Sequence, residues 1–216
     1  VVTGTLAAGR MTTDTVLRVL PTGGDIKIRG LQVHGVSQKV AVAGQRVAAN
    51  LSGVEVSDIA RGDTVVPPGR FEATRRLDTL LALLPTSRPL KHGARVRFHQ
   101  GTSEVLGRVA IGPLVGDPGV GAGRDDETGE RDDAPGDLKP GGHAFARLRL
   151  ESPAVLTRGD RFILRTYSPP VTIAGGLVID PEPPRGGMRT AAGRRRLERL
   201  RVGLDTDSSG EDETVT

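Results

Sequence analysis

The residues of this chain best suited to bind a ligand are basic side chains that recur in one segment. They are Lys91, Arg95 and Arg97, and the residues between them, Ala94, Val96 and Phe98, are apolar. Because successive side chains of a β-strand point to opposite faces, this spacing predicts an apolar face toward a core and a cationic face toward solvent. A cationic face can bind the phosphates of a nucleic acid, or it can be an ordinary solvated surface. His99 extends the face but should add little at neutral pH, where an unperturbed imidazole is mostly uncharged.

A second candidate is Arg46, in a strand predicted to follow a turn at Gly44. Val47, Ala49 and Leu51 would share one face of this strand. Arg46 therefore lies on the opposite, less apolar face, where a guanidinium group is free to contact a ligand.

The chain lacks the residue patterns of common catalytic and metal sites. No glycine-rich loop is followed by Lys-Ser or Lys-Thr, so the phosphate-binding loop of a nucleotide site is missing. The histidines, His34, His92, His99 and His143, lie far apart without metal-ligand spacing, which favours surface or rim positions. We therefore expect no catalytic residue, metal site or cofactor here, and no enzymatic activity of the chain alone.

Composition favours small β-barrels in a reducing compartment. The 216 residues include 30 glycines, 15 prolines, four phenylalanines, one tyrosine, and no tryptophan or cysteine. Short β-branched runs between Gly and Pro turns predict strands around a thin aliphatic core. The lack of cysteine excludes disulfides and fits the cytoplasm. No apolar run approaches the ~20 residues of a membrane span, so we expect no membrane partner. The chain begins at Val1, as we expect of a piece of a longer protein.

The formal net charge of +4 hides a separation of signs. The segment 117–137 has eight acidic and two basic residues, and the segment 205–216 has five acidic and no basic residues. Without these segments, whose net charges are −6 and −5, the remainder carries +15. This charge suits a polyanionic partner such as RNA, although solvated surface arginines would also account for it.

Turn residues divide the chain into two strand-rich units, which we predict to be consecutive antiparallel barrels. The first covers residues 1–70, and its Pro-Pro-Gly end at 67–69 is a natural boundary because proline stops ladder pairing. A single helical turn over 57–60 and an Arg-Gly-Asp turn at 61–63 precede its last strand. The other strands of this unit are expected near 1–6, 14–20, 26–33, 40–42 and 46–51.

The second unit covers residues 71–182. Its strands are expected near 74–84, 90–101, 103–111, 144–150, 161–167 and 172–179, and those at 144–150 and 161–167 also present arginines on one face. A segment of about 116–139, rich in Gly, Asp and Glu, should be a mobile, disordered loop because it has too few apolar residues to offset its ordering entropy.

Residues 183–216 should form a frayed tail. Two helical turns at 194–200 would be too short to persist without a packing partner. The acidic end from Asp205 should be disordered.

As a set, the segments resemble the second and third domains of the selenocysteine-specific elongation factors, a family of translational GTPases. In the first unit these segments are Val-Val-Thr-Gly-Thr at 1–5, Arg-Gly-Leu-Gln-Val-His-Gly at 29–35, and Ala-Gly-Gln-Arg, Asn-Leu-Ser-Gly-Val-Glu and Arg-Gly-Asp between 43 and 63. In the second they are Arg-Pro-Leu-Lys-His at 88–92, Val-Arg-Phe-His-Gln-Gly-Thr at 96–102, and Arg-Phe-Ile-Leu-Arg at 161–165. The resemblance covers residues 1–181 apart from the insertion.

The resemblance implies a role in delivering selenocysteyl-tRNA to the ribosome at recoded UGA codons. It implies that the first unit and a GTPase domain, which this chain lacks, hold the selenocysteyl end, and that GTP and Mg²⁺ bind to that GTPase domain. It assigns Arg46 to the selenocysteyl pocket, because the family has an arginine at the matching position. It also makes Lys91, Arg95 and Arg97 candidates for contact with the tRNA backbone.

Three other functions stay open at this point. The chain could be the barrels of a factor that delivers another aminoacyl-tRNA, a stand-alone barrel protein that binds RNA or the ribosome, or a gene fragment without function. The sequence does not decide whether the GTPase and winged-helix domains of the family are encoded separately or lost, nor does it give the oligomeric state.

Overall fold

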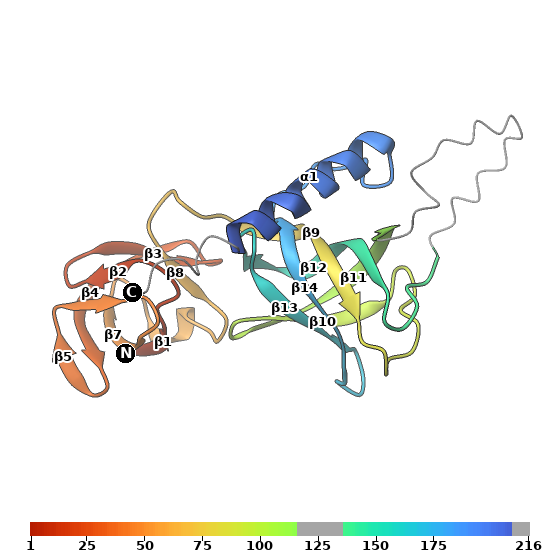
Figure 1. The fold of residues 1–216 in the computed structure, drawn as a ribbon. Coiled ribbons are helices and arrows are strands. Elements are labelled where there is room, and N and C mark those ends of the chain that lie inside the picture. Colours follow the sequence, from red (N-terminus) through yellow and green to blue (C-terminus); the bar gives the residue numbers. More distant parts are fainter. Residues whose placement is uncertain (116–135, 209–216) are drawn as a thin grey trace, which may run out of the picture. The chain divides into compact units, whose positions relative to one another are not determined.

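The computed structural model describes residues 1–115 and 136–208, which are built mainly from antiparallel strands (Figure 1). The chain divides into two compact units, Val1–Ala73 and Thr74–Thr216. The predicted all-β class is therefore confirmed, and each unit has its own apolar core.

The first unit forms a six-stranded sheet and a separate two-stranded sheet around one core. The large sheet has the order β1-β7-β4-β3-β8, with β5 paired to β4, and β2 pairs with β6. Ile28 and Val19 are fully buried in the core. The strands are β1 (Val2–Thr5), β2 (Arg10–Thr12), β3 (Val16–Leu20), β4 (Gly24–Val33), β5 (Val36–Gln38), β6 (Val40–Val42), β7 (Arg46–Ser52) and β8 (Thr64–Val66), with a 3-10 turn η1 (Val56–Asp58).

The end of β7 shows why the sequence needs glycine where a turn was predicted. Gly53 has a φ of +89°, and a Cβ at this position would lie 2.9 Å from the carbonyl oxygen of Asp25. Only glycine tolerates both the left-handed backbone and this close approach. The Arg-Gly-Asp segment that follows η1 is also a turn, as predicted, because Asp63 Oδ2 accepts a hydrogen bond of 2.7 Å from the backbone N–H of Ala60.

The second unit is a closed barrel of six strands in the order β10-β11-β12-β9-β14-β13. Leucines and two stacked phenylalanines fill its interior, where the ring centroids of Phe98 and Phe162 are 5.1 Å apart. The strands are β9 (Ala73–Leu83), β10 (Arg95–Gln100), β11 (Ser103–Leu114), β12 (His143–Val155), β13 (Arg161–Thr166) and β14 (Thr172–Asp180).

The last residues of the expected loop of about 116–139 are instead anchored to the barrel. Residues 116–135 lie outside the described part of the chain. Leu138, however, is 1% exposed in the barrel core and exchanges two backbone hydrogen bonds of 2.9 Å with Leu90. This one apolar side chain, at the end of a polar segment, returns the chain to the barrel.

The tail is helical over a longer range than the two turns expected at 194–200, because it has a packing partner. Helix α1 (Ala191–Ser208) lies along the second unit (Figure 1). Its Leu197 is fully buried in a cluster with Phe145 of β12 and Ile179 of β14. The hydroxyl of Thr190 caps the helix by accepting a hydrogen bond of 3.1 Å from the N–H of Gly193. The helix continues through 205–208, where disorder was expected, and 209–216 lie outside the described residues.

Candidate nucleic-acid interface

Strand β10 separates an apolar and a cationic face, as its sequence predicts. Val96 and Phe98 are buried in the barrel, whereas Arg95 is exposed and Arg97 is half-buried on the outside. Lys91 does not continue this row. It lies in the turn before β10, where its carbonyl accepts a hydrogen bond of 3.1 Å from Ala94, and its own side chain is exposed. The prediction that Lys91 shares one strand face with Arg95 and Arg97 is therefore wrong.

The strand register extends the cationic face across the barrel. Arg95 lies opposite Arg108 of β11, and Arg108 lies opposite Arg149 of β12. Arg97 lies opposite Arg165 of β13. Directly opposed residues have Cβ atoms about 4.5–5.5 Å apart, so these side chains are close neighbours. We call Arg95, Arg97, Arg108, Arg149 and Arg165 the cationic face.

Two carboxylates and one aromatic ring organise this face. Glu151 accepts hydrogen bonds of 2.9 Å from both Nε and Nη2 of Arg95, and Glu104 pairs with Nη1 of Arg97. Tyr167 places its ring 4.5 Å from the guanidinium carbon of Arg95 and accepts, through its carbonyl, a hydrogen bond of 3.0 Å from Arg97 Nε. Arg95 and Arg97 are therefore held in position by groups that are themselves exposed.

These contacts lower the pKa of both carboxyl groups. The hydrogen bond from Arg95 lowers the pKa of Glu151, and the charge of Arg108 lowers it further. The hydrogen bond from Arg97 lowers the pKa of Glu104. The charges of His99 and Arg165 lower this pKa further. Five arginines thus meet two anions on this face, which leaves an excess of positive charge.

Arg46 is the first residue of β7 and lies opposite Thr5 of β1. Its neighbour Val47 is buried and Arg46 is exposed, as the alternation predicts. Farther along the same outer face, Ala48 and Asn50 line a shallow hollow of about 200 Å³ with residues of β4. Arg46 does not line this hollow, and its side chain is exposed.

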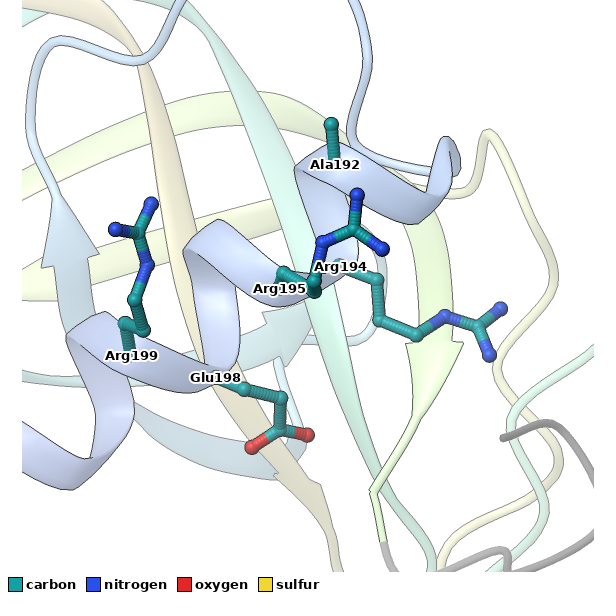
Figure 2. Close-up of a pocket in the computed structure, with 5 residues that line it drawn as sticks. All are labelled: Ala192, Arg194, Arg195, Glu198 and Arg199. Carbon is teal, nitrogen blue, oxygen red and sulfur yellow. The ribbon is translucent and has the colours of Figure 1, made fainter. Parts of the chain in front are cut away.

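The outer surface of helix α1 carries further arginines, but they do not converge. The residues along a shallow hollow there are Ala192, Arg194, Arg195, Glu198 and Arg199. Figure 2 shows the guanidinium groups of Arg194 and Arg195 pointing in different directions. Small-molecule sites need polar groups that converge in a concave pocket, so we assign no ligand to this surface.

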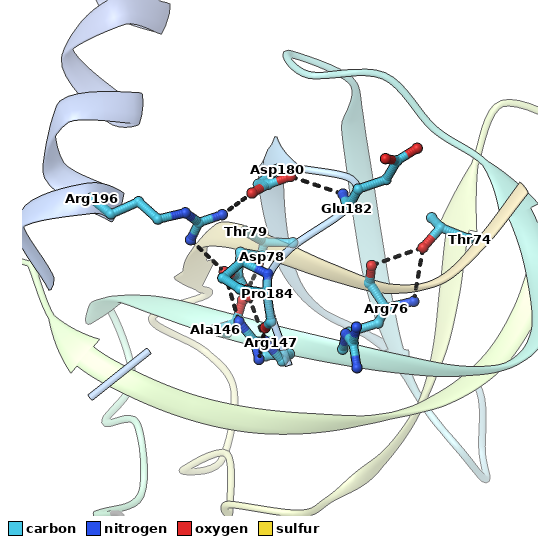
Figure 3. A network of polar contacts seen from close by, with 10 residues as sticks. All are labelled: Thr74, Arg76, Asp78, Thr79, Ala146, Arg147, Asp180, Glu182, Pro184 and Arg196. Atoms are coloured by element: carbon cyan, nitrogen blue, oxygen red, sulfur yellow. Dashed lines mark hydrogen bonds and ion pairs between the residues drawn. The ribbon is translucent and has the colours of Figure 1, made fainter. Parts of the chain in front are cut away.

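The inner side of α1 carries an ion-pair network that is buried (Figure 3). Asp78 of β9 is 0% exposed and accepts hydrogen bonds of 2.7 and 3.0 Å from Arg147 of β12. Arg196 of α1 donates a third, of 3.1 Å, to Asp78 and pairs with Asp180 of β14. Arg147 also donates to the carbonyl of Pro184 at 2.9 Å. Because these bonds join the tail to three strands, we interpret the network as structural.

Two family models match this chain. Residues 77–185 match the model described as "Selenocysteine-specific elongation factor, beta-barrel domain", which covers just over half of the chain. Residues 1–66 match "Elongation factor Tu domain 2". The chain belongs to the selenocysteine-specific elongation factors.

Full-length members of this family show the same relationship. The selenocysteine-specific elongation factor of Desulfomicrobium baculatum is 35% identical over 84% of this chain, and that of Escherichia coli is 30% identical over 88%. These matches cover 25% and 26% of the two relatives, so this chain spans about a quarter of their length. The crystal structure of apo SelB from Methanococcus maripaludis shares the fold, with a TM-score of 0.66 at 19% identity over 84% of this chain and 39% of that one.

The structure adds two observations that bear on the function of this family member. Among residues 1–115 and 136–208, no group of three or more His, Asp or Glu side chains is placed to hold a metal ion. In the same ranges, no helix is both long and apolar enough to cross a membrane.

Proposed function

We propose that this chain is the tRNA-holding part of a selenocysteine-specific elongation factor. The observation that carries the proposal is the cationic face, which gathers five arginines on one side of a barrel in a member of this family. In the proposed function the second unit contacts the tRNA backbone and the first unit contacts the selenocysteyl end. The complete factor then delivers this tRNA to the ribosome at recoded UGA codons in the cytoplasm.

The proposed contact of the first unit is between Arg46 and the selenocysteyl group. A selenol is mostly ionised at neutral pH, whereas the hydroxyl of a seryl group is neutral. A guanidinium group forms charge-assisted hydrogen bonds that favour the anion. The exposed position of Arg46 at the start of β7 leaves it available for this contact.

A fusion protein that supplies a GTPase domain tests this role. We expect Arg46→Ala to weaken binding of selenocysteyl-tRNA more than binding of seryl-tRNA. Arg70→Ala removes the same charge from another exposed position of the first unit and serves as the control. An equal loss for both tRNAs would mean that Arg46 does not discriminate between them.

GTP and Mg²⁺ belong, in this proposal, to a GTPase domain that acts with this chain. The printed sequence has no loop of backbone amides and lysine to surround the phosphates. We expect calorimetry of this chain with a GTP analogue and Mg²⁺ to show no binding. Micromolar affinity would contradict the assignment.

The salt dependence of tRNA binding tests the role of the second unit. Neutralising phosphates of an RNA or DNA duplex releases counterions, with a slope of about −0.9 per phosphate in a plot of log K against log salt. We expect the double variant Arg95→Ala/Arg97→Ala to bind tRNA more weakly and with a slope flatter by about two units. The control is Arg195→Ala/Arg199→Ala, which removes the same charge from α1.

Circular dichroism must first show that both double variants fold. Equal slopes for the wild type and the Arg95/Arg97 variant would leave the cationic face as a solvated surface. A flatter slope only in the Arg195/Arg199 variant would move the tRNA contact to α1.

A further inference from the structure

The arginines at the centre of the cationic face are already occupied in the free protein. Arg95 makes a two-pronged ion pair with Glu151, which is the geometry that guanidinium groups also use for phosphates. Arg97 pairs with Glu104 in the same way that it would pair with one phosphate oxygen. A polyanion that binds this face must therefore replace two carboxylates.

Both ion pairs are easy to exchange. The side chains of Glu151 and Glu104 are 44% and 46% exposed, and those of Arg95 and Arg97 are 37% and 32% exposed. Exposed ion pairs are weak because water screens the charges and two long side chains must be held in place. A carboxylate released from such a pair regains full hydration, so its loss opposes the incoming anion only slightly.

Arg95 and Arg97 each have a second contact, with Tyr167, that does not involve a carboxylate. The ring of Tyr167 lies 4.5 Å from the guanidinium carbon of Arg95 and 5.6 Å from that of Arg97. Its carbonyl oxygen accepts the hydrogen bond of 3.0 Å from Arg97 Nε. The guanidinium groups are thus oriented by contacts that do not involve the carboxylates.

We propose that Glu151 and Glu104 are internal competitors for RNA phosphates, and that they set the affinity of the cationic face by occupying Arg95 and Arg97 until an RNA backbone replaces them. The lowered pKa values of both carboxyl groups agree with this role, since each remains an anion at neutral pH. Competition of this kind lowers the affinity for every polyanion by a small factor, because each ligand has to displace the same two groups. The inference rests on the proposed contact between this face and tRNA.

The test compares Glu151→Gln, Glu104→Gln and the double variant of the full chain with wild type. The ligand is an unacylated transcript of the selenocysteine tRNA at fixed salt. Glutamine keeps the shape of each side chain but removes the charge that competes with phosphate. We expect each single variant to bind about twofold to fivefold more tightly, and the double variant to gain roughly the product of the two.

A matched control separates competition from a change in net charge. Glu182 is exposed and follows the end of β14, outside β10 and the two strands that pair with it, so Glu182→Gln changes the net charge equally. A gain in Glu182→Gln equal to that in Glu151→Gln would overturn the proposal. A second cycle places Glu151→Gln in the Arg95→Ala background, where the gain should be clearly smaller because only the charge of Arg108, and no paired guanidinium group, is released.

Thermal unfolding of each variant verifies that the barrel is intact. If Arg95→Ala/Arg97→Ala weakens tRNA binding and the glutamine variants do not tighten it, competition is disproved while the tRNA contact stands. If the arginine variant also binds as wild type does, both the proposed contact and the competition are overturned.

Discussion

Arg147 and Arg149 lie two residues apart on β12, and their side chains point to the same face of the strand. Their surroundings nevertheless differ completely. The side chain of Arg147 is 5% exposed and is bonded to a carboxylate that is fully buried. Arg149 is exposed in the cationic face. The difference arises because the tail, through Pro184 and α1, covers the barrel at Arg147 and leaves it open at Arg149.

The same chemistry therefore serves two purposes on one barrel. Arginine–carboxylate pairs that α1 covers are shielded from water, so removing one partner leaves a buried charge without compensation. The pairs of Arg95 and Arg97 are open to water and can be exchanged for phosphates. Burial, rather than residue type, decides whether an ion pair stabilises the fold or can be exchanged for a ligand.

The largest effect is expected from Asp78→Asn, which removes the central charge of the buried network. Asp78 accepts three hydrogen bonds from Arg147 and Arg196, and its loss leaves Arg147 buried beside a neutral amide. We expect the free energy of unfolding to fall by about 3–5 kcal/mol. Urea denaturation followed by circular dichroism measures this free energy. A loss as small as that expected for an exposed pair would contradict the proposed difference between the buried network and the cationic face.

A somewhat smaller loss is expected from Leu197→Ala, which weakens the cover without touching the ions. Leu197 is fully buried against Phe145 and Ile179. Truncation should cost about 2–4 kcal/mol. Hydrogen exchange should rise throughout α1 and remain slow in β10, since β10 contributes no residue to this cluster. Unchanged exchange in α1 would show that the ion pairs alone hold the helix.

A modest pH effect is expected at His92, which joins the tail to the barrel. Its Nδ1 accepts a hydrogen bond of 3.1 Å from the N–H of Ile111 and lies 3.2 Å from Nη2 of Arg189, so the imidazole is neutral in this arrangement. Partial burial, and then the charge of Arg189, lower its pKa from the ordinary 6.5. The unfolded chain therefore binds the proton first, and this contribution to stability is complete above pH 6.5 and is lost as the pH falls below it.

Comparison of unfolding at about pH 7.5 and about pH 5.5 measures this contribution. His92→Gln cannot titrate in this range and should lose less stability on acidification than wild type. Equal losses would exclude His92 as the source.

The smallest effect is expected from Glu151→Gln on stability. The pair of Glu151 with Arg95 is exposed to water on both sides, so the midpoint of urea unfolding should not shift measurably. The same substitution should tighten tRNA binding. Glu151→Gln is therefore expected to change binding without changing stability, whereas Asp78→Asn is expected to lower stability. A large loss of stability would place Glu151 with the buried network.

The sequence predicted which side chains of a strand are buried or exposed better than it predicted how the strands pair. Burial of Val96 and exposure of Arg95 follow from a period of two, which is a local property. The alignment of Arg95 with Arg108 and Arg149 depends on register, which no single strand encodes. Lys91 was misplaced because Gly93, with a φ of +78°, turns the chain before β10 begins.

The length of the helix in the tail was underestimated for a different reason. The sequence 194–200 was treated as an isolated helix, for which two turns are too few. Leu197, Leu200 and Leu204 follow the spacing of one helix face, which was the available signal for a packing surface. Burial of Arg147 could not be inferred before this surface was known, because Arg147 and Arg149 both alternate with apolar residues in the same way.

The anchoring of Leu138 to Leu90 has a practical consequence for protein engineering. On one flank of the segment 116–135, Val115 donates a backbone hydrogen bond of 3.0 Å to His143, and on the other, Leu138 and Leu90 exchange two of 2.9 Å. Both flanks are thus fixed to the barrel independently of the residues between them. Since the cost of closing a loop rises by only about 0.6 kcal/mol for each doubling of its length, a reporter domain inserted between 116 and 135 should leave the barrel folded.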